Sequence, residues 1–239
     1  PPQGIGADMI AVEYGLGRDD LDEFGARSQQ RAAVARDEGR FENEIIPVEV
    51  EIDGRSEVVT SDEGIREGTT AETLAKLKPA FKEDGVITAG NSSQISDGAS
   101  GVLIMSKEKA DELGMKPRAR FHAFAVTGAD PVTMLKGPIP ATKKILEKTG
   151  LTIDDIDLFE VNEAFASVVL AWQKETGADM EKVNVNGGAI ALGHPLGASG
   201  TKLMSTLLNE LERTGGRYGL QVMCEGGGMA NATIIERLD

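Results

Sequence analysis

From about residue 119 onward, strand-like and helix-like segments alternate along this chain of 239 residues. The expected strands span 118–126, 154–161, 183–185, 220–224 and 229–237, and the expected helices between them span 140–148, 163–176 and 199–213. An alternation of this kind is typical of a layered α/β domain. We therefore predict an α/β fold in which helices flank a mixed sheet of five strands.

The first 90 residues lack this alternation, and we expect them to form an appended, loop-rich α+β region. The expected elements are helices at 7–14 and 19–38, a strand with an internal proline at 45–52, and a loop over 53–70. The longer helix carries one stripe of small and apolar side chains, made of Leu21, Phe24, Ser28, Ala32 and Ala35.

Two further patterns predict local structure before the alternating part begins. Thr69-Thr70-Ala71-Glu72 resembles a capping box, with Thr69 as the cap and Glu72 reaching back, so a short helix to Lys78 is expected. The apolar run at 101–105 predicts a strand, and residues 107–113 predict a helix that stops at a glycine.

Charge and cysteine content exclude several classes of function. The chain has 39 acidic and 25 basic residues, a net charge of −14, which argues against nucleic acid because phosphate binding needs a basic face. No apolar run is long enough to span a membrane, and no signal peptide is visible. A single cysteine excludes an intrachain disulfide and fits a reducing, cytoplasmic location. With one Cys and two His, no metal site is expected.

Three segments near the C-terminus hold the side chains best suited to chemistry, namely Asn162–Phe165, Gly193–Pro195 and Cys224–Gly228. Each follows a strand-like run and lies among small residues. Together they offer an amide, an imidazole and a thiol, the ingredients of covalent or acid/base chemistry on a carbonyl. An imidazole near the carboxyl edge of a sheet lies where α/β proteins usually bind ligands.

Each of these residues also has a structural interpretation. His194 is either a catalytic imidazole or a hydrogen-bonded loop histidine, and Cys224 is either reactive or a buried small hydrophobe. Asn162 lies at a strand-to-helix junction, where asparagine also caps helices well. The glycines after Cys224 favour function, because they let backbone N–H groups approach an oxyanion. His122 lies in an alternating strand and is expected to be structural.

The ordered set of motifs resembles the thiolase family over essentially the whole chain. Besides the three C-terminal segments, the resemblance rests on Arg27–Ala33, Thr88–Ser93, Asp97–Ala99 and Gly137-Pro138. It implies a thiolase-like layered fold with part of the loop domain at 1–90, the returning end of the N-terminal domain at 91–118 and the C-terminal domain at 119–239.

The resemblance also implies a role for each site residue. His194 would activate the nucleophilic cysteine and help to form one oxyanion hole, in which Asn162 would hold a water. Cys224 would be the acid/base at the α-carbon of the acetyl group, and the Gly226 N–H would belong to a second oxyanion hole. The matching positions that contact coenzyme A are Arg66, Thr73 and Ser93, and those that line its pantetheine tunnel are Met134 and Phe165.

The implied activity is that of an acyl-CoA C-acetyltransferase, which cleaves a 3-ketoacyl-CoA with CoA or condenses acetyl-CoA in reverse. Coenzyme A would be a substrate, no cofactor would be tightly bound, and a homodimer or homotetramer is expected. The family's nucleophilic cysteine would precede Pro1, so we expect most of the N-terminal domain to be absent and the fragment alone to be inactive. Gln3 stands where biosynthetic thiolases often carry Met, which weakens the case for acetoacetyl-CoA as the dedicated substrate.

Two other interpretations stay open. A condensing enzyme of the ketoacyl-synthase type would use two histidines beside one cysteine, and the set of Asn162, His194 and Cys224 argues against it. A non-catalytic, thiolase-like protein that binds acyl-CoA or lipid is favoured by the missing nucleophile.

Overall fold

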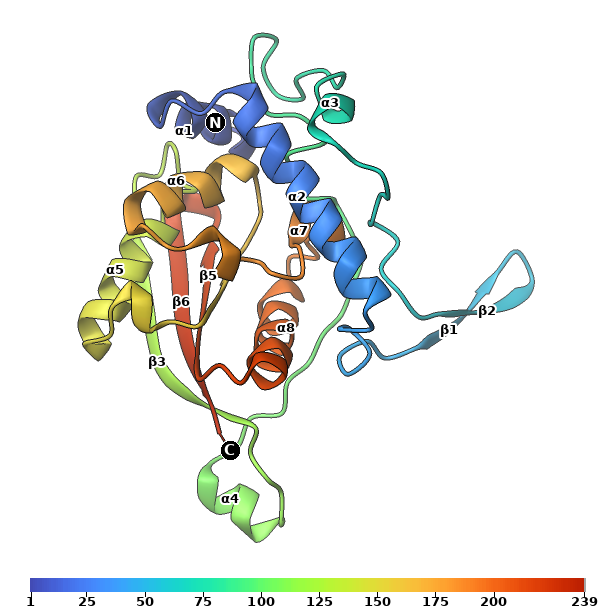
Figure 1. Cartoon of the computed structure of the whole chain (residues 1–239), viewed down its shortest axis with the longest axis vertical. Helices are drawn as coiled ribbons and strands as arrows, with labels where there is room; N and C mark the ends of the chain where they lie inside the picture. Colours follow the sequence, from blue (N-terminus) through green and yellow to red (C-terminus); the bar gives the residue numbers. More distant parts are fainter. Residues whose placement is uncertain (239) are drawn as a thin grey trace.

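The chain folds around a mixed sheet in the computed structural model, which describes residues 1–238 (Figure 1). The sheet has four strands, in the spatial order β3 (Ala119–Gly128), β6 (Met229–Arg237), β5 (Tyr218–Cys224) and β4 (Leu158–Val161). The first three of these pair antiparallel, whereas β5 and β4 are parallel. The predicted α/β fold with a mixed sheet is therefore confirmed.

The fifth expected strand, at 183–185, joins the sheet through a single parallel bridge, between Val183 and Phe159 of β4. The reason is Asn184, whose backbone has a φ of 47° and leaves the extended conformation. Its side-chain amide takes the place of a strand residue: the Val161 N–H donates to Asn184 Oδ1 (2.8 Å), and Asn184 Nδ2 donates to Val161 O (2.9 Å). A side chain thus ends the sheet at this edge.

Helices cover both faces of the sheet and are α5 (Pro138–Thr149), α6 (Ala166–Thr176) and α8 (Ser199–Thr214). Figure 1 shows α5 and α6 on one side and α8 on the other. Because strand side chains alternate, Phe159 faces α6, where it packs edge-to-face on Trp172 with ring centroids 5.5 Å apart. Its neighbour Leu158 points the other way and packs with Leu207 of α8.

The other edge of the sheet is β3, which pairs only with β6. Two lysines of α5 reach this edge: Lys144 Nζ donates to Val126 O (2.8 Å) and Lys148 Nζ donates to Phe124 O (3.0 Å). Backbone carbonyls that have no strand partner are therefore satisfied by ammonium groups.

The N-terminal helices α1 (Gln3–Glu13) and α2 (Arg18–Asp37) pack beside the sheet domain, α1 against α6 and α2 against the short helix α7 (Ala189–Leu192). Both were predicted, although α1 begins four residues earlier than expected, at Gln3 instead of residue 7. The predicted stripe of α2 is buried along its length, from Leu21 to Ala35. The helix ends where predicted, because Gly39 takes a φ of +72° just beyond it.

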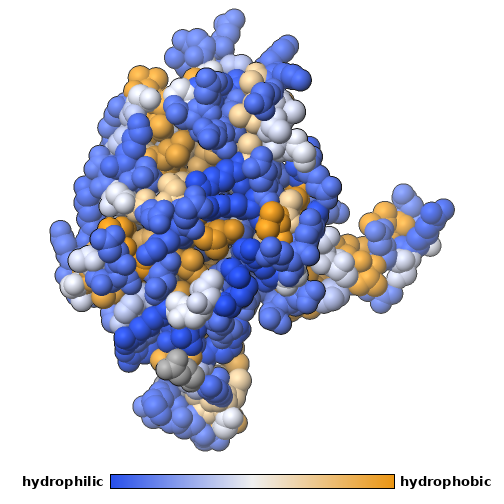
Figure 2. Space-filling model, in the orientation of Figure 1, coloured by the Kyte–Doolittle hydropathy of each residue, from blue (hydrophilic) through white to orange (hydrophobic). Residues whose placement is uncertain are grey.

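The prediction of a loop over 53–70 was wrong in part, because β1 (Val48–Ile52) and β2 (Arg55–Val59) form a two-stranded antiparallel hairpin. Asp53 and Gly54 make its turn with φ angles of 52° and 74°, the backbone that an Asp-Gly pair adopts readily. Figures 1 and 2 show this hairpin as an arm that projects from the body, with apolar side chains among the polar ones.

Two further local predictions were wrong. Helix α3 (Ala71–Leu74) is capped by Thr70 with Thr73, one residue later than the predicted pair Thr69 and Glu72. The segment 101–105 has no strand pairing, and Leu103 and Ile104 are 73% and 62% exposed, because no described strand lies alongside it. The helix that follows, α4 (Lys107–Glu112), forms as predicted.

Three short 3-10 helices complete the structure, at Ile153–Asp155, Met180–Lys182 and Gly226–Gly228. Within residues 1–238, no helix combines the length and apolar character needed to cross a bilayer.

Candidate active site

The parallel pairing of β4 and β5 brings two candidate residues to one edge of the sheet. Asn162 directly follows β4, and its backbone N–H donates to Val222 O of β5 (3.0 Å). Cys224 ends β5 two residues later. Because parallel strands end at the same edge, the amide and the thiol lie at the carboxyl edge of the sheet, as predicted for ligand-binding residues of α/β folds.

The imidazole of His194 contacts the Asn162 side chain at this edge, with Nε2 and Nδ2 3.3 Å apart. Its other ring nitrogen, Nδ1, lies 2.6 Å from Ser199 Oγ, and this hydroxyl donates to Pro195 O (3.0 Å). A hydroxyl has one proton, so Nδ1 must donate to Ser199 and Nε2 is left with a lone pair. The arrangement assigns a tautomer with an unprotonated Nε2.

Ser199 was not singled out in the sequence, although it begins α8 five residues after His194. A hydroxyl at the start of a helix that follows a Gly-His-Pro turn is the signal that was missed. Burial lowers the pKa of His194, so the ring is neutral at pH 7 and Nε2 can accept a proton.

The amide oxygen of Asn162 has no hydrogen-bond partner within residues 1–238. Asn162 is 2% exposed, and among the described residues nothing donates to its Oδ1. A buried acceptor without a donor is costly, so the site favours a water or a ligand group that can donate to this oxygen.

The thiol of Cys224 is half-buried beside the glycine turn. Burial and the neighbouring Glu225 raise its pKa to about 12, so the thiol is protonated at pH 7. In the turn, Gly227 and Gly228 have φ angles of 76° and 86°, which side chains rarely allow. A Cβ at Gly226 would lie 4.0 Å from Gln3 Nε2, so Gln3 of α1 borders this turn.

The buried carboxylate of Glu163 joins the segments that carry these groups. Its Oε2 accepts from Ser28 Oγ (2.6 Å) and from the Ile190 N–H (3.2 Å), and its Oε1 accepts from Asn184 Nδ2 (2.9 Å). Burial raises the pKa of this carboxyl, and the three donors oppose that shift. Glu163 therefore holds α2, the Asn184 turn and α7 together immediately beside Asn162.

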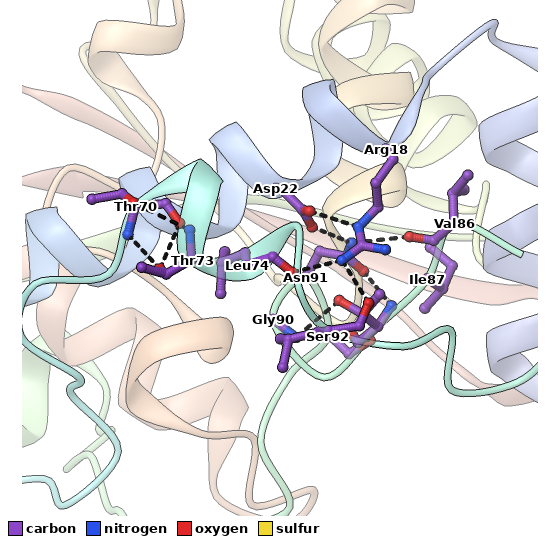
Figure 3. A network of polar contacts seen from close by, with 12 residues as sticks. Arg18, Asp22, Thr70, Thr73, Leu74, Val86, Ile87, Gly90, Asn91 and Ser92 are labelled. Carbon is purple, nitrogen blue, oxygen red and sulfur yellow. Dashed lines mark hydrogen bonds and ion pairs between the residues drawn. The ribbon is translucent and has the colours of Figure 1, made fainter.

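A second polar network fixes the segment around Ser93 (Figure 3). Asp22 accepts from Arg18 Nε (2.6 Å) and from Asn91 Nδ2 (3.0 Å). The backbone of Asn91 in turn accepts from the Ala166 N–H (2.9 Å), and the Ser93 N–H donates to the carbonyl of Ala164 (3.0 Å). The predicted coenzyme A residue Ser93 thus lies directly beside the segment that follows Asn162.

The remaining predicted contacts with coenzyme A are spread around this region. Arg66 is exposed, and its guanidinium makes no hydrogen bond or ion pair with the described residues. The Thr73 hydroxyl is used in the cap of α3, where it donates to Thr70 O (2.8 Å). Met134 is buried, with a φ of 38°.

The predicted tunnel residue Phe165 is buried at the start of α6. Phe81, which sequence reasoning missed, packs edge-to-face on it with ring centroids 5.8 Å apart. Phe81 also lies against Gly4, where a side chain would collide with its ring. Because Phe81 and Phe165 are 84 positions apart along the chain, the sequence gives no sign that their rings are in contact.

Comparisons with known proteins identify the family of this chain. The model of the thiolase C-terminal domain matches residues 115–237, and that of the thiolase N-terminal domain matches residues 2–108. The chain belongs to the thiolase family. It is 57% identical over 233 residues to the steroid 3-ketoacyl-CoA thiolase FadA6 of Mycobacterium tuberculosis, covering 98% of this chain and 56% of that protein.

Solved structures show the same fold. The acetyl-CoA acetyltransferase of Bacillus anthracis matches with a TM-score of 0.96 and 43% identity, over 98% of this chain and 60% of its own. Human mitochondrial 3-ketoacyl-CoA thiolase in complex with CoA matches with a TM-score of 0.93 and 43% identity, over 98% and 58%.

The expectation of an absent N-terminal half is not supported, because both domain models match. The chain spans 56% of the length of the curated relative and 58–60% of the two solved structures.

Proposed function

We propose that this chain provides the acid/base half of a thiolase-type acyl-CoA C-acetyltransferase active site. The observation that carries the proposal is the pairing of Asn162 with the neutral His194, at the same sheet edge as the protonated thiol of Cys224. A ketoacyl-synthase-type enzyme would need a second histidine here, and the partner of His194 is the Asn162 amide.

In this proposal His194 activates a nucleophilic thiol that attacks the 3-keto carbon of a 3-ketoacyl-CoA. Its Nε2 is the unprotonated ring nitrogen, so it can accept the thiol proton as the carbon–sulfur bond forms. The oxygen of Asn162 that has no partner would hold a water whose hydrogen bond stabilises the developing oxyanion.

Cleavage of the bond between the α and β carbons leaves the acyl group as a thioester on the nucleophilic thiol, from which a second CoA thiol takes it, and leaves the electron pair on an acetyl-CoA enolate. The thiol of Cys224 then donates its proton to the α-carbon, and its raised pKa keeps that proton available at pH 7. The Gly226 N–H would stabilise the enolate oxygen. In the reverse condensation the Cys224 thiolate would remove the same proton.

The second thiol is not among the 239 residues, whose one cysteine is Cys224. We propose that the nucleophile lies elsewhere in the complete polypeptide, and that this chain alone does not cleave acetoacetyl-CoA. We further propose a cytoplasmic enzyme that assembles as a homodimer or homotetramer. Coenzyme A would be bound as a substrate by Arg66, Thr73 and Ser93, with its pantetheine arm against Met134 and Phe165.

The test is Cys224→Ser in the complete polypeptide. Carbon–carbon cleavage should fall by at least about 10²–10⁴-fold, the usual contribution of acid/base catalysis. Mass spectrometry after incubation with acetyl-CoA should still show an acetylated protein, because the nucleophile is a different thiol. Loss of acetylation would reassign Cys224, and a wild-type protein that binds CoA without turnover would favour the non-catalytic interpretation.

A further inference from the structure

We propose that Gln29 and Gln94 are positioning residues that hold the loop of Arg66 against the helix leading to His194. The inference rests on the proposed contact between Arg66 and coenzyme A. Because the guanidinium of Arg66 has no partner among the described residues, its place depends on how its backbone is anchored.

Gln29 anchors that backbone with both ends of one amide. Its side chain projects from α2 and the residue is 5% exposed. The Arg66 N–H donates to Gln29 Oε1 (2.7 Å), and Gln29 Nε2 donates to Ile190 O in α7 (3.2 Å). One buried side chain therefore links the loop of Arg66 to the helix that ends two residues before His194.

Gln94 makes a parallel link from another segment. Its Nε2 donates to Gly64 O (2.9 Å) and to Ile190 O (2.9 Å). Its backbone carbonyl also accepts from the His194 N–H (3.1 Å). The loop approaches α7 so closely that a side chain at Gly64 would collide with the Ala191 carbonyl.

Gln29 and Gln94 contact different groups, and this difference allows the inference to be tested. Gln29 bonds the backbone of Arg66 and the Ile190 carbonyl but not His194, so its loss should weaken CoA binding and spare chemistry. Gln94 is the less selective probe, because its side chain donates to three carbonyls and its backbone carbonyl accepts from the His194 N–H.

The experiment measures KM for CoA and kcat for cleavage of acetoacetyl-CoA by the complete polypeptide. Its four proteins are wild type, Gln29→Met, Arg66→Ala and the double variant. Met matches the size of Gln and removes both hydrogen bonds. Gln29→Met should raise KM about three- to tenfold, with kcat within about twofold, as expected for lost hydrogen bonds that act on binding. In the Arg66→Ala background it should raise KM no further, because Gln29 acts through Arg66.

Two controls separate positioning from general loss of structure. Gln173→Met in α6 removes the hydrogen bond from Gln173 Nε2 to Ala178 O (3.4 Å) and should leave KM unchanged. Gln29→Glu keeps the acceptor for the Arg66 N–H but loses the donor to Ile190 O, so its KM should lie between those of wild type and Gln29→Met. If Gln29→Met does not fold, Gln29→Glu replaces it in the cycle, and a KM equal to that of wild type would count against the assignment.

The failures can be told apart. An unchanged KM in Arg66→Ala would overturn the proposed CoA contact, whatever Gln29 does. A raised KM in Arg66→Ala with an unchanged KM in Gln29→Met would overturn the inference alone. Effects of the two substitutions that multiply in full would also overturn it, because independent sites add in free energy.

Discussion

The sheet domain and the hairpin arm both contain strands, but they differ in what surrounds them. The strands β4 and β5 are buried on both faces by α6 and α8, and every residue of β4 is buried. In the arm, eight of the ten residues of β1 and β2 are exposed. Packing therefore holds the side chains of the sheet in fixed positions, whereas the arm is held only by the hydrogen bonds between β1 and β2.

The largest effect that this comparison predicts is on catalysis at the sheet edge. His194→Ala in the complete polypeptide should lower kcat by about 10²–10⁴-fold, because the base for the nucleophile is lost. Steady-state cleavage of acetoacetyl-CoA measures it. A matched substitution in the arm, Arg55→Ala, should leave kcat within about twofold. Equal losses of kcat in the two variants would show that the sheet edge and the arm do not differ in their importance for catalysis.

The next largest effect is on stability. Trp172 is fully buried between Phe159 and Thr142, which accepts a hydrogen bond from its Nε1 (2.8 Å). Trp172→Ala should destabilise the fold by about 3–5 kcal/mol, as aromatic-to-alanine changes in cores do. Chemical denaturation of the complete polypeptide measures the change. A loss below about 1 kcal/mol would mean that this core collapses around the cavity.

A third prediction uses pH. Glu160 of β4 is buried on the α8 side, and burial raises the pKa of its carboxyl well above the ordinary value. The positive charge of Lys202 opposes this shift. Three nearby carboxyl groups raise the pKa further, those of Glu163, Glu44 and Glu210. A carboxyl with a raised pKa in the folded state favours its proton there, so its contribution to stability is lost as pH rises above the unfolded pKa.

Glu160→Gln removes this ionisation. The variant should therefore gain stability relative to wild type between pH 5 and pH 8, with the gain growing as pH rises. Melting temperatures at several pH values measure it. Glu57→Gln in the exposed arm serves as the control and should show no such trend. A constant offset for Glu160→Gln at all pH values would count against the assignment.

The smallest effect belongs to the arm. Val58 is exposed on β2, and Val58→Ala should change the free energy of unfolding by no more than about 0.5 kcal/mol. The same denaturation assay applies. A loss as large as that of Trp172→Ala would show that the arm is packed against something in the working protein.

Sequence periodicity predicted the elements that bury a regular face. The stripe of α2 and the alternation of β3 were visible because one side of each must face a core. The segment 101–105 shows the limit, since an apolar run becomes a strand only beside a partner, and the described residues offer none. The hairpin was missed although Asp53-Gly54 is a strong turn signal.

The site was predictable in kind but not in its supports. Asn162 follows β4 and Cys224 ends β5, positions that a sequence reveals, whereas His194 follows the short helix α7. Ser199 and Phe81 act through contacts made in three dimensions: one fixes the tautomer of His194, and the other packs on Phe165. The protonated state of Cys224 also depends on burial, which residue type alone does not determine.

Side chains close both borders of the four-stranded sheet. The amide of Asn184 occupies the hydrogen-bonding groups of Val161 at one border, and Lys144 and Lys148 occupy carbonyls of β3 at the other. An open strand border is a template on which another chain can add a strand. Here the groups of Val161 and the carbonyls of Phe124 and Val126 are already occupied, which disfavours the addition of a foreign strand at these positions.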